Sequence, residues 1–406
     1  MIRQGLLFAL VAALGALRVA AQDVPALPEG AGKTLVQGAC TKCHSLDRVV
    51  RSGNTPDGWR TTVSMMVNYG AKLTPQQVTL VSKYLSANFP PRGPHAVILP
   101  GSWHVAIKEW EVPTPGSRPH DPLATRDGMI WYTGQLANVL GRLDPRTGTI
   151  QEYHLPIADS GPHGLVADSV GHIWYTANFK GYIGELDPRT GNVIVHHLPA
   201  VARDPHTPRF DRNGTLWFTV QGADLVGRLD PKTGATKVVQ VPTPHANPYG
   251  MVIDSHDVPW FAEFGSNKLA SIDPLSMHIT EYALPNADAR PRRVAIVNDV
   301  IYYSDYARGY LGRFDTRTHA ITEWPSPGGP NSQPYGITFT KGAIWYSESG
   351  VQPNTLVRFD VHEHTFQTWP IPSGGGVVRN MMPTPDGNIA MACSGVNRIA
   401  LATLSP

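Results

Sequence analysis

Two of the three cysteines are separated by two residues and followed directly by a histidine, in the stretch Cys40-Thr41-Lys42-Cys43-His44. This C-x-x-C-H pattern is typical of covalent haem attachment. Two thiols about one helical turn apart can add to the two haem vinyl groups, while the adjacent imidazole coordinates the iron. A redox dithiol or half of a zinc site is the alternative, but zinc would need two more ligands nearby. The sequence therefore predicts one covalent haem c on Cys40 and Cys43, with His44 as an axial ligand.

The other face of the iron needs a second ligand, and the stretch TTVSMMVNYG offers Met65 and Met66. A thioether ligand would raise the reduction potential of the iron relative to ligation by two histidines. Further on, Thr74 can cap a helix, and Gln77 can complete a capping box with it. The sequence therefore predicts an amphipathic closing helix that begins after Thr74.

Residues 22–92 resemble a class I cytochrome c domain. The resemblance is carried by a W-x-x-x-V-x-x-M-x-x-x-G phrase formed by Trp59, Val63, Met66 and Gly70, and by a terminal helix that contains Tyr-Leu. It implies a small all-α domain in which Met66 is the second iron ligand. Met65 would then pack beside the haem.

A different organisation follows a Pro- and Gly-containing linker, which we place at 93–102. The phrase IWYTGQLANVLGRLDPRTGTIQEYHLP recurs in variant form, and its aromatic marker returns every 42 or 43 residues. Such a period, with short strands and D-P-R-T-G turns, predicts a β-propeller over 103–406. The last repeat lacks its outer strand, and AIKEWEVP at 106–113 matches that strand in phase. We therefore expect seven blades, the last completed by the N-terminal strand. The markers are Trp131, Trp174, Trp217, Trp260, Tyr302 and Trp345.

The repeat phrasing resembles the streptogramin B lyase (virginiamycin B lyase) family, whose repeats are written P-Y/H-G-I, W-F-T-E, I-G-R and E-Y-x-L-P. The resemblance implies a seven-bladed propeller, a histidine base in the P-H-G phrase and a magnesium-binding Glu after W-F. Here His163 matches the base, whereas Glu263 and Glu348 match the acid. No blade carries both parts, although neighbours such as His206 and Glu263 could assemble.

Equivalent positions at the start of the innermost strands should form a ring at one mouth of the channel. Histidines and carboxylates converging from rigid strands could hold a divalent metal, with the three histidines as its site, or perform acid–base chemistry. The alternative is a polar lining that meets channel water. The ring positions are His120, His163, His206, Tyr249, Arg292 and Tyr335, with Asn380 on the seventh repeat, and the acids of the next strand are Glu263, Asp305 and Glu348.

Composition limits the function classes. Residues 1–21 contain Arg3, an apolar run and small residues before position 22, which predicts a signal peptide and an exported or periplasmic protein. The apolar run is too short to span a membrane, so we expect no transmembrane segment after cleavage. Loss of that segment removes two arginines and lowers the formal charge from +2 to zero, which gives no support for nucleic-acid binding. Three cysteines cannot build a disulfide framework, and Cys393 is expected to be a buried small side chain.

Three functions are compatible with this sequence. The first is an exported c-type cytochrome in which haem-mediated electron transfer is coupled to a lyase-like propeller that binds or converts a small molecule. Its partner would be a redox protein or a small electron donor or acceptor. The second is a metal-assisted C–O lyase of the streptogramin type. The third is a propeller that binds or senses a ligand without turnover. We favour the first, because elimination transfers no net electrons and has no need of haem.

Overall fold

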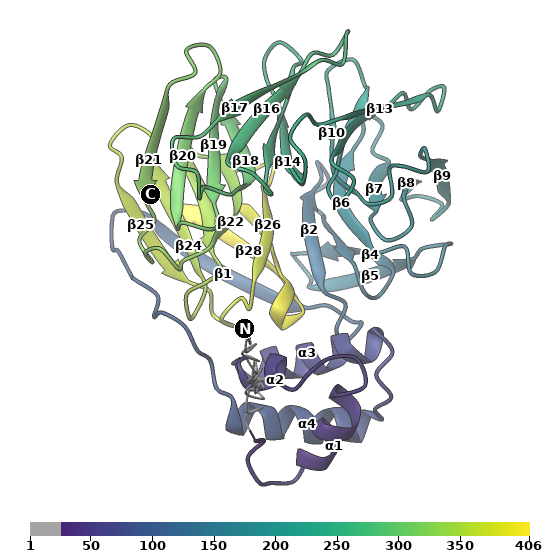
Figure 1. Ribbon diagram of the computed structural model, residues 1–406, viewed down its shortest axis with the longest axis vertical. Coiled ribbons are helices and arrows are strands. Elements are labelled where there is room, and N and C mark those ends of the chain that lie inside the picture. The colour runs from purple at the N-terminus through teal and green to yellow at the C-terminus, as the bar shows by residue number, and fades with distance from the viewer. Residues whose placement is uncertain (1–25) are drawn as a thin grey trace, which may run out of the picture.

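Short strands rich in β-branched and aromatic residues make up most of the chain beyond residue 103 (Figure 1). The computed structural model describes residues 26–406, so the expected signal segment 1–21 lies outside the described residues. The strands form seven four-stranded antiparallel sheets. The innermost strands of successive sheets contact one another around a closed ring. The prediction of a seven-bladed β-propeller is confirmed.

Each of the first six blades uses four consecutive strands, numbered from the centre outward. Blade 1 has β2 (Pro119–Ala124), β3 (Ile130–Gly134), β4 (Val139–Asp144) and β5 (Thr149–His154). Blade 2 has β6 (Pro162–Ala167), β7 (Ile173–Ala177), β8 (Tyr182–Leu186) and β9 (Val193–His197). Blade 3 has β10 (Pro205–Phe210), β11 (Leu216–Val220), β12 (Leu225–Leu229) and β13 (Thr236–Gln240).

Blades 4 to 6 repeat this plan. Blade 4 has β14 (Pro248–Ile253), β15 (Pro259–Glu263), β16 (Lys268–Ile272) and β17 (Ile279–Ala283). Blade 5 has β18 (Pro291–Val297), β19 (Val300–Asp305), β20 (Tyr310–Asp315) and β21 (Ile321–Pro325). Blade 6 has β22 (Pro334–Thr340), β23 (Ala343–Glu348), β24 (Thr355–Asp360) and β25 (Phe366–Pro370).

Blade 7 joins the two ends of the propeller chain. It contains β26 (Val378–Pro383), β27 (Ile389–Cys393), β28 (Arg398–Ser405) and, as its outer strand, β1 (His104–Glu111), with a one-turn 3-10 helix η1 (Ser394–Val396) between β27 and β28. Strand β1 pairs antiparallel with β28 along its whole length, from His104 opposite Ser405 to Glu111 opposite Arg398. Because the outer strand comes from the start of the propeller chain, the ring is closed by backbone hydrogen bonds.

The described residues before the linker form four helices: α1 (Lys33–Cys40), α2 (Asp47–Val50), α3 (Pro56–Asn68) and α4 (Pro75–Asn88). The expected capping box on α4 is confirmed, since the Thr74 hydroxyl accepts from the Gln77 amide and the Gln77 side chain accepts from the Thr74 amide. A small core that includes Val36, Trp59 and Leu85 joins these helices. No helix of residues 26–406 is long and apolar enough to cross a bilayer.

The expectation of a small all-α cytochrome c domain over 22–92 is wrong as a fold assignment. The described residues of this segment contribute only four small helices, and one of them, α2, spans only Asp47–Val50. The phrase from Trp59 to Gly70 marks one amphipathic helix and its end, which many small helical folds share. We therefore call residues 26–92 the helical segment.

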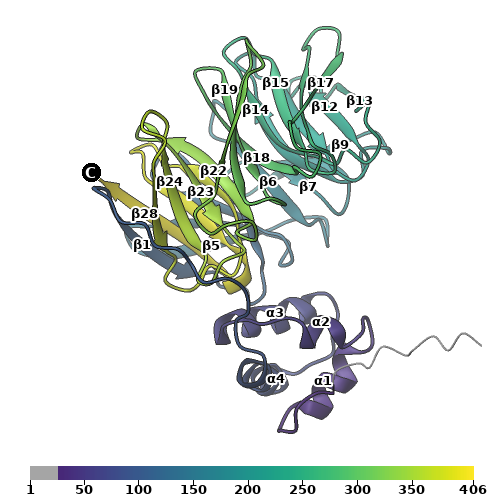
Figure 2. The same cartoon turned by 60° about the vertical axis from the view of Figure 1, so that its left-hand side comes forward.

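The helical segment lies against one face of the propeller (Figures 1 and 2). The Asn68 side chain at the end of α3 donates to the carbonyls of Pro115 and Gly116, each at 3.0 Å, in the loop that leads into β2. Gly116 has φ +66, and a Cβ there would come within 2.5 Å of the Met65 amide nitrogen. Ion pairs add to this contact, Arg60 with Glu111 and Arg398 with Asp57. The segment thus lies at the face where the innermost strands begin.

Candidate functional site

The ring residues predicted from the repeat lie at the second position of their innermost strands, at the face that the helical segment adjoins. The first residue of each of these strands pairs with the last residue of the next strand, as Pro119 does with Gly134, and a register shift follows. In blade 7 Val378 pairs with Cys393 in the same way. The seventh ring residue is therefore Arg379, and the expectation of Asn380 was one residue out. We call this set the channel ring: His120, His163, His206, Tyr249, Arg292, Tyr335 and Arg379.

Four rings of this set lie side by side with their planes tilted by 42 to 53°. The ring centroids are 3.6 Å apart for His120 and His163, 3.8 Å for His163 and His206, and 4.0 Å for His206 and Tyr249. All four are buried. Burial, and then neighbouring charged groups that include Arg293, hold the pKa of each imidazole well below its usual range. The three histidines are therefore neutral near pH 7, and Nδ1 of His163 is buried without a hydrogen-bond partner among the described residues.

Arginine and tyrosine complete the other side of the channel ring. The Arg292 guanidinium lies 3.8 Å from the ring centroid of Tyr335 and 4.4 Å from that of Tyr306, a cation–π arrangement. The Tyr335 and Tyr249 hydroxyls are 2.5 Å apart. Burial alone would raise the pKa of Tyr335, but the positive charges of Arg292 and Arg379 lower it to about 8. Burial and its phenol neighbour raise the pKa of Tyr249 to about 12.

An ion pair that the sequence analysis missed crosses the channel from blade 1 to blade 5. Arg293 donates to both carboxylate oxygens of Asp121, at 2.7 and 3.3 Å, and both side chains are buried. The His120 Nδ1 lies 2.9 Å from the same carboxylate. The available sequence signal was the residue after the ring position, which is Gly in blades 2, 4 and 6 but Asp121 and Arg293 here.

The acids expected near the histidines are bonded to groups close to them in the chain or in a neighbouring loop. Glu348 accepts from Ser326, Gly328 and Thr355. Glu263 accepts from the Ser266 hydroxyl at 2.6 Å, and burial raises its pKa to about 7. Asp305 pairs with Arg308 at 3.1 Å. These carboxylates hold the strand ends, so the structure does not bring them into one cluster with the histidines.

A divalent metal fits the channel ring poorly. Ligand atoms of His120, Asp121 and His163 do lie within 4.8 Å of one another. The Asp121 carboxylate, however, is already paired with Arg293. His206 is not a member of that group, and Arg118 and Arg379 add positive charge around His120. A divalent cation would have to displace the Arg293 guanidinium from Asp121 and lie near other guanidinium groups, which is electrostatically unfavourable.

A pocket in the helical segment brings together the residues predicted to hold haem. Cys40, Cys43, His44 and Met66 line it, whereas Met65 is not among its lining residues. The His44 Nδ1 lies 3.0 Å from the Ser45 carbonyl oxygen. When Nδ1 donates to that oxygen, Nε2 keeps its lone pair for a metal. All three cysteines are free thiols, and burial raises the pKa of Cys40 and, much further, that of Cys393. The other lining residues are Ala39, Val63, Tyr69, Ala71, Leu73 and Val81.

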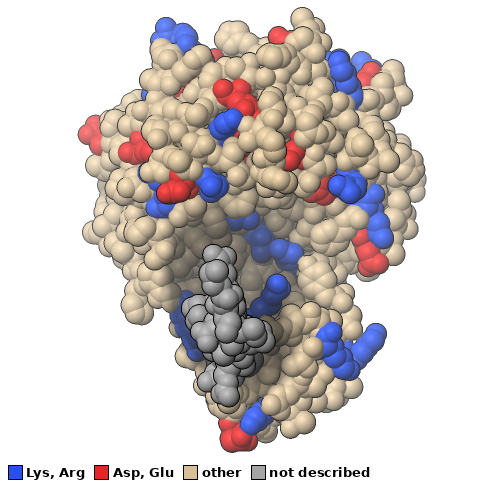
Figure 3. Space-filling view, in the orientation of Figure 1, with Lys and Arg blue, Asp and Glu red and all other residues tan. Residues whose placement is uncertain are grey.

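One contact connects this pocket with the channel ring. Tyr69 lines the pocket, and its hydroxyl accepts from the Arg118 guanidinium at 3.3 Å. Arg118 stands two residues before His120, and its pKa is lowered by burial and by the charge of Arg379. Figure 3 shows a hollow between the propeller and the helical segment in which Lys and Arg side chains gather. The two candidate sites therefore adjoin at a basic hollow.

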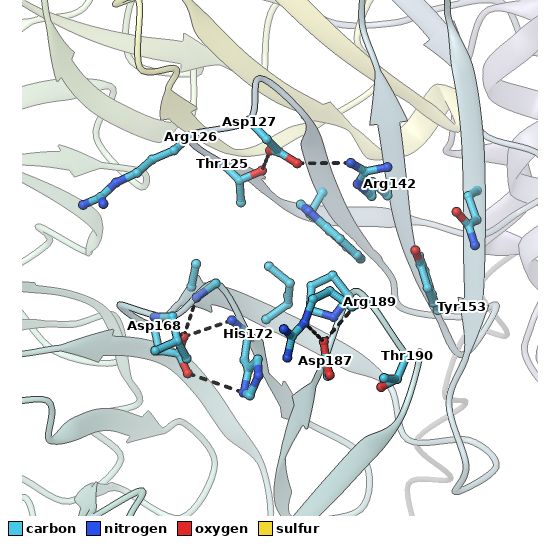
Figure 4. A pocket seen from close by; sticks show the side chains of 18 of the residues that line it. Thr125, Arg126, Asp127, Arg142, Tyr153, Asp168, His172, Asp187, Arg189 and Thr190 are labelled. Carbon is cyan, nitrogen blue, oxygen red and sulfur yellow. Dashed lines mark hydrogen bonds and ion pairs between the residues drawn. The ribbon is translucent and has the colours of Figure 1, made fainter.

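A wide cleft of about 1070 Å³ opens on the opposite face, at the turns of blades 1 and 2 (Figure 4). Asp168, His172 and Glu185 lie close enough there to hold a metal. Asp168, however, accepts from the backbone amides of its turn and from the Trp174 indole at 2.9 Å. The same hydrogen bond from a tryptophan indole to a turn aspartate recurs between Trp217 and Asp211 and between Trp260 and Asp254. Because the repeat copies this contact, turn structure explains the place of Asp168. The Glu185 carboxylate is already bonded to His172 and His196, at 2.7 and 3.0 Å.

Known proteins resemble the propeller part of the chain. The profile described as the virginiamycin B lyase family matches residues 102–349, which includes none of the helical segment. A solved streptogramin B lyase is 27% identical, with a TM-score of 0.68 over 74% of this chain and 98% of its own. Virginiamycin B lyase from Staphylococcus aureus is 24% identical, with a TM-score of 0.67 over 74% and 99%. A catalytically inactive variant of that enzyme, solved with quinupristin, matches equally well. No curated protein matches the chain in sequence.

Proposed function

The chain belongs to the virginiamycin B lyase family, and from this premise we propose that it is an exported haem protein whose propeller binds and converts a small molecule at the channel ring. Family membership supports the propeller part of this proposal. The ring itself supports it further, because neutral imidazoles, phenols and guanidinium groups converge there from rigid strands. Such groups can orient a ligand and accept or donate protons.

The observation that carries the haem proposal is the pocket in which Cys40, Cys43, His44 and Met66 face one space. Two thiols, one imidazole and one thioether are a complete set for covalent attachment and axial ligation of haem c. The apolar remainder of the lining suits the porphyrin. A bound haem would supply one-electron chemistry. Since Tyr69 and Arg118 join the pocket to the channel mouth, we propose that electrons pass between the haem and the ligand or a redox partner at the basic hollow.

Haem attachment is tested by removing one thioether. We expect Cys40→Ala to lose half of the covalent linkage, so that the pyridine haemochrome absorption shifts from that of c-type haem to that of a single-thioether haem. His44→Ala should lose low-spin iron. Cys393→Ala is the matched control, because that thiol is buried in the propeller and should leave the spectrum unchanged. An unshifted spectrum in Cys40→Ala would refute the haem proposal.

Substitution of the two adjacent methionines should have opposite effects on the spectrum of the iron. Met66 lines the pocket and Met65 does not, so Met66→Ala should convert the iron to high spin and abolish the sulfur-to-iron charge-transfer band. Met65→Ala should leave both in place. Absorption spectra of the oxidised proteins distinguish the two. The reverse pattern would assign the ligand to Met65.

Elimination is the second candidate function, and family membership favours it directly. His163 occupies the position of the family base, is neutral, and has a free Nδ1 that could accept a proton. The magnesium ion that the family resemblance implies does not fit, because both Glu348 oxygens are already hydrogen-bonded and the ring is rich in guanidinium groups. Glu263 keeps one buried oxygen without a partner among the described residues, but it is a single carboxylate.

A comparison of turnover requirements separates the two candidates. Elimination of an ester creates a C=C double bond and a free carboxylic acid without an electron acceptor. We expect quinupristin incubated with the haem-loaded protein to remain unopened, while the Staphylococcus aureus enzyme opens it in parallel. Chromatography with mass spectrometry follows the product. An opened product that is lost in His163→Ala and needs no acceptor would establish elimination and overturn the redox proposal.

A further inference from the structure

We propose that the mouth of the channel is a binding site for a small organic anion, whose carboxylate or phosphate oxygens lie among Arg118, Arg292 and Arg379. The inference names the ligand class of the proposed channel site and rests on that part of the proposed function. It does not depend on the haem.

The first support is uncompensated charge. None of these three guanidinium groups has a carboxylate partner among the described residues, although salt bridges are common elsewhere in the propeller. Asp121, the buried acid beside the channel ring, already forms an ion pair with Arg293. Charges withdrawn from water without a counter-ion are costly, and arginines gathered together repel one another. A bound anion would remove both costs.

The second support is unused hydrogen-bonding capacity. The Nε atoms of Arg292 and Arg379 are buried without a partner among the described residues. No side-chain hydrogen bond of Arg379 occurs within residues 26–406, and the only ones of Arg118 and Arg292 reach phenol oxygens, at 3.3 and 3.4 Å. These long contacts leave most of the donors free. A guanidinium presents a fork of donors that matches two oxygens of a carboxylate or phosphate.

The third support is rigidity. Arg292 lies between the rings of Tyr249, Phe264, Tyr306 and Tyr335, at centroid distances of 3.8 to 5.0 Å. Its charge is therefore fixed in place before a ligand arrives, which lowers the entropic cost of binding. The adjacent, mutually tilted rings of His120, His163 and His206 form an uncharged aromatic wall nearby. The arrangement suits a molecule with an anionic head and a flat or apolar body.

The test uses benzoate as the probe and the full chain as the protein. Isothermal titration at low ionic strength should detect benzoate binding at least tenfold tighter than that of benzyl alcohol, which has the same ring without the charge. Arg379→Gln and Arg118→Gln should each weaken benzoate binding at least tenfold, and Arg379→Lys should recover part of the loss because it restores the charge. Inorganic phosphate, titrated in parallel, should compete with benzoate.

Arg189→Gln is the matched control, since Arg189 is exposed on the opposite face and should leave benzoate binding unchanged. Circular dichroism of each variant confirms its fold. Equal affinity for benzoate and benzyl alcohol, no benzoate binding, or unchanged binding in both folded glutamine variants would overturn the anion site. Turnover of an uncharged substrate without benzoate inhibition would refute this inference and leave the proposed function standing. Benzoate binding without turnover of any substrate would support the anion site and contradict the proposed conversion of a small molecule.

Discussion

Asp121→Asn should lower the free energy of unfolding by about 3–5 kcal/mol, the usual cost of removing one partner of a buried ion pair. The substitution keeps the shape of the side chain but leaves the buried Arg293 guanidinium without its counter-charge. It also weakens the contact with His120 at the channel wall. Denaturant unfolding followed by tryptophan fluorescence measures the loss. Asp127→Asn is the matched control, because the Asp127 carboxylate pairs with Arg142 in a largely exposed position, where a salt bridge contributes about 0–1 kcal/mol.

The same ion pair predicts a pH dependence. Burial alone would raise the pKa of Asp121, but the charge of Arg293 outweighs it and lowers the pKa below the ordinary value. A lowered folded-state pKa means that the carboxylate stabilises the fold above the unfolded pKa, about 4, and that this contribution is lost as the pH falls through the folded value. The difference in free energy of unfolding between wild type and Asp121→Asn should therefore be at its maximum at pH 7 and decrease below pH of about 4. A difference under about 1 kcal/mol at pH 7 would contradict the assigned ion pair.

Gly184→Ala should destabilise the propeller by about 3 kcal/mol, the upper end of the overpacking range. Gly184 lies on β8 opposite Tyr175, and an added Cβ would overlap the tyrosine ring inside the blade. The tyrosine ring cannot move away, because it is buried in the hydrophobic core between blades 1 and 2. The thermal unfolding midpoint measures the effect. The same glycine lies under an aromatic ring in other blades: Gly141 under Tyr132, Gly227 under Phe218 and Gly312 under Tyr303.

Gly38→Ala is the control for that substitution. It stands inside helix α1, where an added Cβ would meet no atom within 4 Å. Alanine favours the helix over glycine, so this variant should be as stable as wild type or slightly more stable. If Gly184→Ala is tolerated equally well, the blade interior is not packed as described.

Sequence periodicity predicted much of the propeller because a strand alternates its side chains with a period of two and the repeat copies that pattern blade by blade. The six ring residues from His120 to Tyr335 follow from their common place in the repeat. The seventh was misplaced by one residue, since Val378 replaces the proline that marks the start of the other innermost strands. In the helical segment the capping residues predicted α4, but a motif for one helix could not determine the fold of the whole segment.

The sequence by itself determined the residue types of the ring and the C-x-x-C-H motif, because both are local in the chain. Only the tertiary structure decided which groups meet. Asp121 and Arg293 are 172 residues apart and become partners because closure of the ring places blades 1 and 5 across one channel. Glu348 is not available to the histidines because the Ser326 hydroxyl and the Gly328 amide, in the loop between blades 5 and 6, already donate to it. Tyr69 meets Arg118 because the helical segment docks on that mouth, a contact between surfaces that no local pattern encodes.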